Sequence, residues 1–178
     1  MLAYLPTLVV LLALPLAGCS RGIHSGTGGW PPAAAAPSLT KITSSADVVE
    51  VRAAAVSIPE GGGADATVSL SVSPGFHINA NPATFPYLIA TDITADKIPG
   101  ITAGQPAYPA AAKKKFQFAD EPLAVYEGKT QIKLPLHAEN NAVKATRSLP
   151  IHVRVQACDN EKCYAPATLE AAIAVEVK

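Results

Sequence analysis

Residues Thr67–Ser73 have the sequence Thr-Val-Ser-Leu-Ser-Val-Ser, in which apolar Val68, Leu70 and Val72 alternate with small hydroxyl side chains. Successive side chains of a β-strand point to opposite faces, so this period of two is typical of a strand with one buried face. Proline and glycine favour turns, and Pro74-Gly75 follows directly. The stretch therefore predicts a half-buried strand that leads into a tight turn.

Further short strands are expected on both sides of this stretch, with turn-forming residues between them. They are Val48–Val51, Tyr87–Ile93, Lys115–Phe118, Leu123–Tyr126, Gln131–His137, Ile151–Ala157 and Leu169–Val177. No long segment shows the 3.6-residue period of a helix. The sequence thus predicts an all-β fold over residues 41–178, an immunoglobulin-like antiparallel β-sandwich.

The charge balance argues against a nucleic-acid-binding function. The 178 residues include 14 basic and 14 acidic side chains, so the formal net charge is zero. A nucleic-acid-binding protein needs an excess of basic side chains to neutralise phosphates. We therefore expect no nucleic-acid partner.

The N-terminus has the features of a bacterial lipoprotein. An apolar run over Leu5–Leu16 leads into Leu16-Ala17-Gly18-Cys19, a lipobox pattern in which the Cys19 thiol accepts the lipid. We predict a signal peptide over residues 1–18 and a Pro/Ala/Gly-rich tether over residues 19–40, anchored to the bilayer through acylated Cys19. Ser20 stands where Asp would retain a lipoprotein at the inner membrane, which favours the outer membrane.

Cys158 and Cys163 are the only thiols left once Cys19 carries lipid, and they form a Cys-x4-Cys pattern. A predicted strand precedes them and another follows, so Asp159–Lys162 is expected to be a hairpin loop. Facing residues of a non-hydrogen-bonded antiparallel pair have Cα atoms about 4.5 Å apart, a separation that a disulfide tolerates. An intramolecular disulfide is therefore plausible on geometry alone.

Three interpretations of this pair remain open from the residues themselves. A structural staple would close a very short loop and add only about 2 kcal/mol in the chain-entropy model. A redox-active dithiol at the exposed end of the sandwich is the second. A metal site that adds His77 or His152 is the third, although Cys-x4-Cys is not a zinc-ribbon spacing.

The sequence gives little support to hydrolase, cofactor or metal chemistry. His77 is expected to hydrogen-bond the Asn79–Pro82 turn rather than to bind a ligand. No Ser-His-Asp order, phosphate loop or metalloprotease motif occurs in the sequence. We expect no cofactor and no metal.

Three stretches, in chain order, carry a family resemblance: Pro74–Pro82, Val125–Gly128, and Gln156-Ala157-Cys158 through Cys163-Tyr164-Ala165-Pro166. Together they resemble the periplasmic N-terminal domain of the thiol:disulfide interchange protein DsbD. The resemblance covers about residues 45–178. It implies an immunoglobulin-like sandwich whose two cysteines accept electrons from a thioredoxin-like domain. The same cysteines then pass the electrons to periplasmic disulfide isomerases or cytochrome-maturation proteins.

The resemblance also implies roles for single residues. Cys163 would form the mixed disulfide with partners, and Cys158 would be the resolving thiol. The family shields its cysteines with a loop that carries Asp-Glu and an aromatic residue. The matching region here makes Phe118, Asp120 and Glu121 candidate cap or modulating residues, while Tyr164 beside Cys163 would shape access to the sulfur.

The sequence departs from the family pattern in three ways. It has one residue fewer between the cysteines than the best-known member, Pro122 follows Asp120-Glu121 where the family has an aromatic residue, and the sequence ends at Lys178. A separate membrane thiol carrier is therefore expected to supply electrons on the periplasmic side. The alternative function is a non-catalytic binding or assembly lipoprotein with a structural hairpin disulfide.

Overall fold

The computed structural model describes residues 41–178. The predicted signal peptide (1–18) and the predicted tether (19–40), which includes Cys19, lie outside the described residues. Within residues 41–178, no helix is long and apolar enough to cross a membrane.

The described chain is built almost entirely of strands. In order, its elements are the 3-10 helix η1 (Ser45–Asp47) and the strands β1 (Val49–Ala53), β2 (Val56–Ile58), β3 (Gly63–Val72), β4 (His77–Asn79), β5 (Asp92–Ala95), β6 (Ile101–Ala103), β7 (Ala112–Lys114), β8 (Leu123–Tyr126), β9 (Lys129–Ala138), β10 (Thr146–Val155), β11 (Ala157–Cys158) and β12 (Ala167–Val177).

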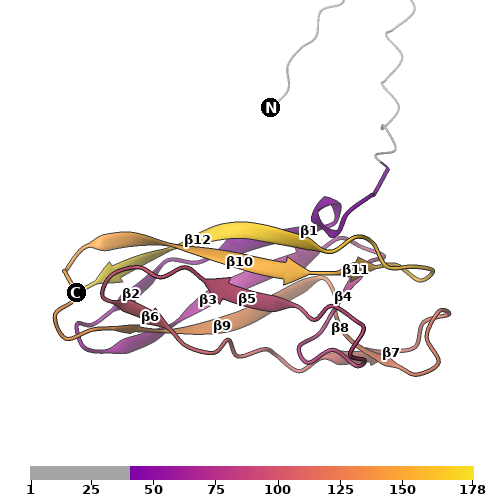
Figure 1. Cartoon of the computed structure of the whole chain (residues 1–178), viewed down its shortest axis with the longest axis horizontal. Coiled ribbons are helices and arrows are strands. Elements are labelled where there is room, and N and C mark those ends of the chain that lie inside the picture. The colour runs from indigo at the N-terminus through magenta and orange to yellow at the C-terminus, as the bar shows by residue number, and fades with distance from the viewer. Residues whose placement is uncertain (1–40) are drawn as a thin grey trace, which may run out of the picture. The chain divides into compact units, whose positions relative to one another are not determined.

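These strands form three four-stranded sheets (Figure 1). The strand orders are β1-β3-β9-β6, β2-β12-β10-β5 and β11-β4-β8-β7. The first two sheets make the body of the sandwich, and the third lies at the end away from the C-terminus. All strand pairs are antiparallel except β2 with β12. The predicted immunoglobulin-like antiparallel β-sandwich is confirmed.

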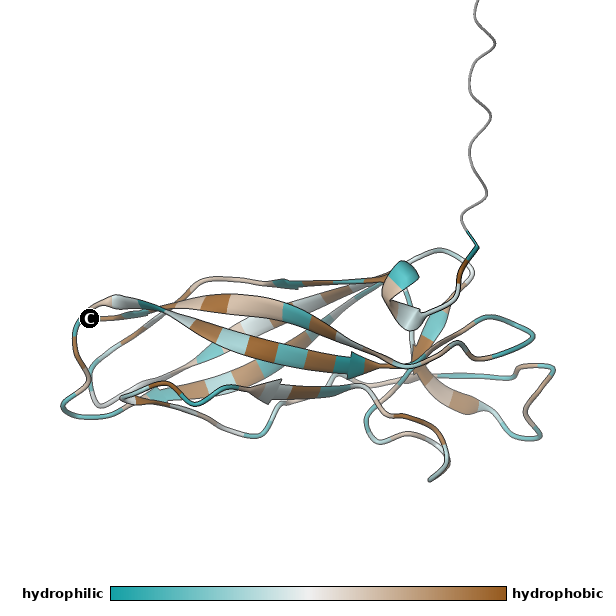
Figure 2. Ribbon diagram, turned by 45° about the horizontal axis from the view of Figure 1, so that its top comes forward, coloured by the Kyte–Doolittle hydropathy of each residue, from teal (hydrophilic) through white to brown (hydrophobic). Residues whose placement is uncertain are grey.

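The hydrophobic core is formed by the apolar residues that alternate with polar ones along the strands. Val68 of β3 lies opposite Ile132 of β9, and Leu149 of β10 lies opposite Ile173 of β12. All four side chains are buried, and the hydrophobic and polar residues alternate along the long strands in Figure 2. Burial of a side chain of this size contributes about 1.5–3 kcal/mol, so the long strands supply the main hydrophobic stabilisation.

The predicted strand Tyr87–Ile93 is formed only at its end, and the predicted strand Lys115–Phe118 is wrong. Residues 87–91 form turns and irregular chain, and β5 begins only at Asp92. Pro86 lacks a backbone N–H, and the Leu88 N–H bonds the carbonyl of Phe85 at 3.1 Å, which closes a turn instead of a ladder. Strand β7 ends at Lys114, so Lys115–Phe118 lies in the loop that follows it.

The third sheet has two apolar faces. Ile78 of β4, Tyr126 of β8 and Ala157 of β11 belong to the main core of the sandwich. The neighbouring positions along these strands point the other way. There Val125 joins Phe116 and Leu123 in a second, smaller cluster. This arrangement places the cysteine hairpin between the main core and a small aromatic cluster.

Candidate functional site

Cys158 and Cys163 form a disulfide at the end of the sandwich, with their Cα atoms 3.9 Å apart. They pair across an antiparallel bridge, as the sequence predicts for a hairpin. The two residues differ in exposure: Cys158 is fully buried, whereas Cys163 is partly exposed. A partner in solution can therefore reach only one of the two sulfurs easily.

Backbone hydrogen bonds flank the cysteine pair on both sides. The Tyr164 N–H donates to the carbonyl of Ala157 at 2.8 Å, and the Asp159 N–H donates to the carbonyl of Lys162 at 2.9 Å. The cysteines thus occupy a non-hydrogen-bonded position, where facing side chains approach most closely. The expected hairpin loop Asp159–Lys162 is confirmed.

Asp159 organises this loop. Its Oδ1 accepts hydrogen bonds from the N–H groups of Glu161 and Lys162, each at 2.8 Å, and its Oδ2 accepts one from the Tyr164 hydroxyl at 2.6 Å. Partial burial favours the neutral carboxyl, but these hydrogen bonds together hold the pKa of Asp159 below its usual value. The same bond to Asp159 raises the pKa of Tyr164.

Ser45 joins the two sides of the hairpin and was not identified from the sequence. Its hydroxyl donates to the carbonyl of Ala165 at 2.7 Å and accepts from the N–H of Ala157 at 2.8 Å. Ser45 is fully buried. The capping pattern Ser44-x-x-Asp47, which starts η1, is the only sequence signal that points to this region.

The side chain of Gln156 binds a second segment beside the hairpin, residues 85–89. Its Oε1 accepts hydrogen bonds from the Ile89 N–H and from Asn79 Nδ2, both at 3.3 Å. Asn79 Nδ2 also donates to the carbonyl of Ile89 at 3.0 Å. Residues 85–89 are thereby held beside the hairpin instead of forming the predicted strand.

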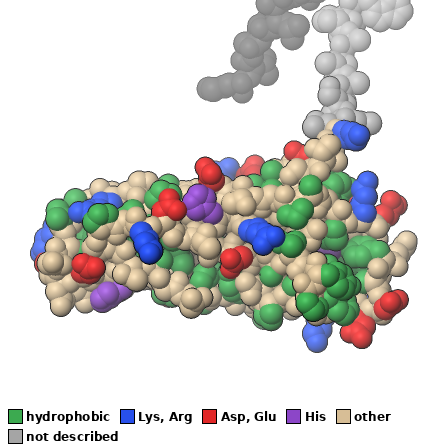
Figure 3. Space-filling view, in the orientation of Figure 1, with side chains coloured by type: hydrophobic (Ala, Val, Ile, Leu, Met, Phe, Trp, Pro, Cys, Tyr) green, Lys and Arg blue, Asp and Glu red, His purple; other side chains and the backbone are tan. Residues whose placement is uncertain are grey.

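A cavity of about 260 Å³ opens beside Cys163. Besides Cys163, it is lined by Tyr87, Leu88, Phe118, Ala119, Leu123 and Gln156. Figure 3 shows hydrophobic side chains gathered at this end of the domain, with acidic side chains near their rim. Among the lining residues, Tyr87 is 73% exposed and Phe118 is 39% exposed. The only accessible sulfur of the pair thus borders an apolar, partly aromatic surface.

The structure brings some of the predicted cap residues to this cavity and not others. Phe118 lines it, and Tyr164 adjoins Cys163 in the chain. Asp120 and Glu121 are exposed and do not line it. The loop that carries them is closed by the Lys115 ammonium, which donates to the backbone carbonyls of Ala119, at 2.7 Å, and of Asp120.

His77 lies under this loop. Its ring stacks on that of Phe116, with the centroids 3.9 Å apart and the planes at 17°. Its burial lowers the pKa of the imidazole. The expected hydrogen bond to the Asn79–Pro82 turn is not formed by Nε2, which is buried and has no partner among the described residues.

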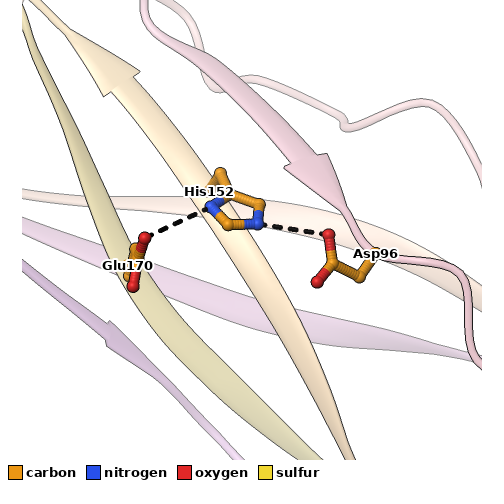
Figure 4. Close-up of polar contacts among 3 residues, drawn as sticks. All are labelled: Asp96, His152 and Glu170. Atoms are coloured by element: carbon orange, nitrogen blue, oxygen red, sulfur yellow. Dashed lines mark hydrogen bonds and ion pairs between the residues drawn. The ribbon is translucent and has the colours of Figure 1, made fainter.

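His152, the other histidine considered as a metal ligand, is engaged elsewhere (Figure 4). Its Nε2 lies 3.1 Å from an oxygen of Asp96, and its Nδ1 lies 3.9 Å from one of Glu170. His152 precedes Cys158 by six positions in an extended chain that rises about 3.3 Å per residue. Within residues 41–178, no group of three or more His, Cys, Asp or Glu side chains is placed to hold a metal ion.

The fold and the site together define a class: an immunoglobulin-like β-sandwich with a disulfide-closed hairpin at one end. The family model described as thiol:disulfide interchange protein DsbD, N-terminal, matches residues 45–174. The chain belongs to this family. A disulfide between Cys158 and Cys163 fits the thiol-disulfide exchange for which the family is named.

Several solved structures are similar to this chain. The N-terminal domain of DsbD from Neisseria meningitidis, in the reduced form, is 18% identical, with a TM-score of 0.44 over 63% of this chain and 78% of that one. The N-terminal periplasmic domain of ScsB from Proteus mirabilis is 14% identical, with a TM-score of 0.47 over 73% of this chain and 47% of that one. No curated protein matches the sequence.

Proposed function

We propose that this chain is a thiol:disulfide interchange module that relays electrons between thioredoxin-like proteins through Cys158 and Cys163. One observation carries the proposal beyond family membership: the partly exposed member of the disulfide borders an apolar cavity, while the other is fully buried. A staple needs no such asymmetry, whereas exchange needs one sulfur that a partner can reach.

The family resemblance gives Cys163 and Cys158 different roles in this proposal, and their unequal burial supports that division. A thiolate of the partner attacks Sγ of Cys163, and the bond to Cys158 breaks, so that Cys158 leaves as a thiolate. The partner's second thiolate then releases Cys163. Two electrons pass from the partner's dithiol to this chain, and the reverse sequence passes them on to an oxidised partner. Cys163 is the exchange cysteine, and Cys158 is the resolving one.

Phe118 acts as a partial cap in this proposal. It lines the cavity beside Cys163, and the loop that carries it is closed by Lys115 through two carbonyls. Displacement of the Phe118 ring would widen the approach to the sulfur. Tyr164, which follows Cys163 in the chain and is held by its hydrogen bond to Asp159, would shape access to the Cys163 sulfur. Exposed Asp120 and Glu121 would contribute negative charge to the surface that a partner contacts.

The proposal extends to location and to partners. Membership of the family supports the periplasmic side, where a membrane thiol carrier would supply electrons through a thioredoxin-like domain. Acylation of Cys19 would tether the domain to a membrane, with the outer membrane favoured by Ser20.

The reduction potential tests the function. The oxidised chain is equilibrated with reduced thioredoxin and with glutathione buffers, and the fraction of reduced Cys158–Cys163 is measured by thiol alkylation. An exchange module should equilibrate with thioredoxin and have a potential above about −300 mV. A lower potential, together with resistance to thioredoxin, would instead support the non-catalytic binding lipoprotein.

A further inference from the structure

His77 is the strand neighbour of the buried cysteine. In the antiparallel pair of β4 and β11, His77 lies directly opposite Cys158, and Ile78 lies opposite Ala157. Directly opposite residues point to the same face of a sheet, with Cβ atoms about 4.5–5.5 Å apart. Ile78 and Ala157 face the main core. His77 and Cys158 therefore share the opposite face.

The imidazole of His77 has an unusual place for a polar group. The residue is 1% exposed, and its ring stacks on buried Phe116. In the disulfide state, Nε2 has no hydrogen-bond partner among residues 41–178. A buried polar atom without a partner costs about 1–3 kcal/mol, and native structures keep few of them. A role in another state of the protein would account for its presence.

Reduction of the disulfide produces a second state of the protein, in which Cys158 has a free sulfur beside the His77 ring. Once the disulfide opens, Cys158 carries a thiol or thiolate in a site from which water is excluded, and a thiolate there needs a hydrogen-bond donor. We propose that His77 is a positioning residue for the dithiol, whose Nε2–H donates a hydrogen bond to Sγ of Cys158 when the disulfide is open. This inference rests on the proposed exchange function.

Opening of the disulfide needs no reactant besides the partner's thiolate. The partner's thiolate forms a bond to Cys163, the bond between Cys163 and Cys158 breaks, and Cys158 receives the electron pair. His77 donates a hydrogen bond to this thiolate and keeps its proton. In the reverse direction, the same bond holds the Cys158 thiolate in place for attack on the mixed disulfide.

The surroundings keep His77 neutral at neutral pH. Burial lowers the pKa of His77, Lys114 of β7 acts in the same direction, and Glu127 after β8 and Asp159 of the hairpin oppose them. A neutral imidazole has one N–H, and the inference places it on Nε2. With its proton on Nε2, the neutral imidazole can donate a hydrogen bond toward Cys158.

A titration of Cys158 tests the inference directly. The full chain with Cys163→Ser leaves Cys158 as the free sulfur of the pair, and it is compared with the same chain carrying His77→Phe. Phenylalanine keeps an aromatic ring against Phe116 and removes Nε2. Thiolate absorbance in the ultraviolet is followed against pH, with the Cys158→Ala/Cys163→Ser chain as the blank. The matched control is His137→Phe, at an exposed position of β9.

The inference predicts about tenfold less Cys158 thiolate at a given pH in His77→Phe and no change in His137→Phe. Equal titration of Cys158 with and without the His77→Phe substitution would overturn it. If circular dichroism shows that His77→Phe is unfolded, His77→Gln and His77→Met decide, because both lack the ring and only glutamine donates. Equal titration in these two variants would then overturn the inference.

The two proposals fail in different ways. In the chain with both cysteines, reduction by reduced thioredoxin should slow severalfold in His77→Phe, because the leaving thiol becomes a poorer one. If thioredoxin does not reduce the unsubstituted chain, the exchange function fails, and the Cys158 titration still decides the role of His77.

Discussion

Cys158 and Cys163 belong to one disulfide but lie in different surroundings. Cys158 is fully buried, whereas Cys163 is partly exposed and lines the cavity. Hydrogen bonds from residues far away in the sequence hold this arrangement. Ser45 makes two of these contacts, since its one hydroxyl binds both sides of the hairpin.

Ser45→Ala should lower the free energy of unfolding by about 1–3 kcal/mol, because it leaves the buried Ala157 N–H without its partner. Denaturant titration measures the change. The control is Ser57→Ala on β2, whose exposed hydroxyl lies 3.2 Å from Glu176 and should matter little. Equal losses for the two variants would contradict the role given to Ser45.

At the scale of elements, the site is a hairpin flanked by two irregular segments. The loop after β7 supplies Phe118, and the segment before β5 supplies Tyr87 and Leu88. Neither is a strand, so their side chains can lie across the end of the third sheet. The accessibility of Cys163 therefore depends on loops, which a partner displaces more readily than strands.

Phe118→Ala should increase the rate at which dithiothreitol reduces the disulfide severalfold, because it removes one wall of the cavity beside Cys163. Alkylation of the released thiols at timed intervals measures this rate. Val143→Ala is the control, since Val143 is 61% exposed and does not line the cavity. An unchanged rate in Phe118→Ala would show that Phe118 does not shield the disulfide.

The long strands and the hairpin were predictable because their signals are local. Alternation along β3, β9, β10 and β12 and the spacing of the cysteines each involve neighbouring residues. The segment before β5 has a strand-like composition, yet side chains of Asn79 and Gln156 bind its backbone. The bonds of Ser45 span 112 and 120 positions. Such contacts depend on the tertiary fold, so the sequence does not reveal them.

At the scale of the whole molecule, the proposed exchange domain follows a predicted lipid anchor. The domain belongs to the DsbD N-terminal family, and the anchor rests on the lipobox that ends at Cys19. A tethered exchange module would work at a membrane surface, where several acyl chains hold it effectively permanently. The partners it reaches would then be those of the same compartment.

The unsubstituted protein should fractionate with membranes, whereas Cys19→Ala should become soluble or stay uncleaved, because it cannot accept lipid. Cell fractionation with immunoblotting measures this. Ser20→Asp is the control: it should remain bound to membrane but move toward the inner one. Equal soluble fractions for Cys19→Ala and the unsubstituted protein would refute the lipoprotein.

The trapping of mixed disulfides by single cysteine variants tests the central claim most directly. Cys158→Ala should accumulate a mixed disulfide with thioredoxin-like partners through Cys163, because the resolving thiol is missing, and Cys163→Ala should trap little. Non-reducing gels measure the adducts, and circular dichroism checks folding, which should survive the loss of a cross-link worth about 2 kcal/mol. Trapping only through Cys158 would reverse the roles of the two cysteines. If neither folded variant traps a partner, the disulfide is a structural staple, and the account of this chain as an exchange module is contradicted.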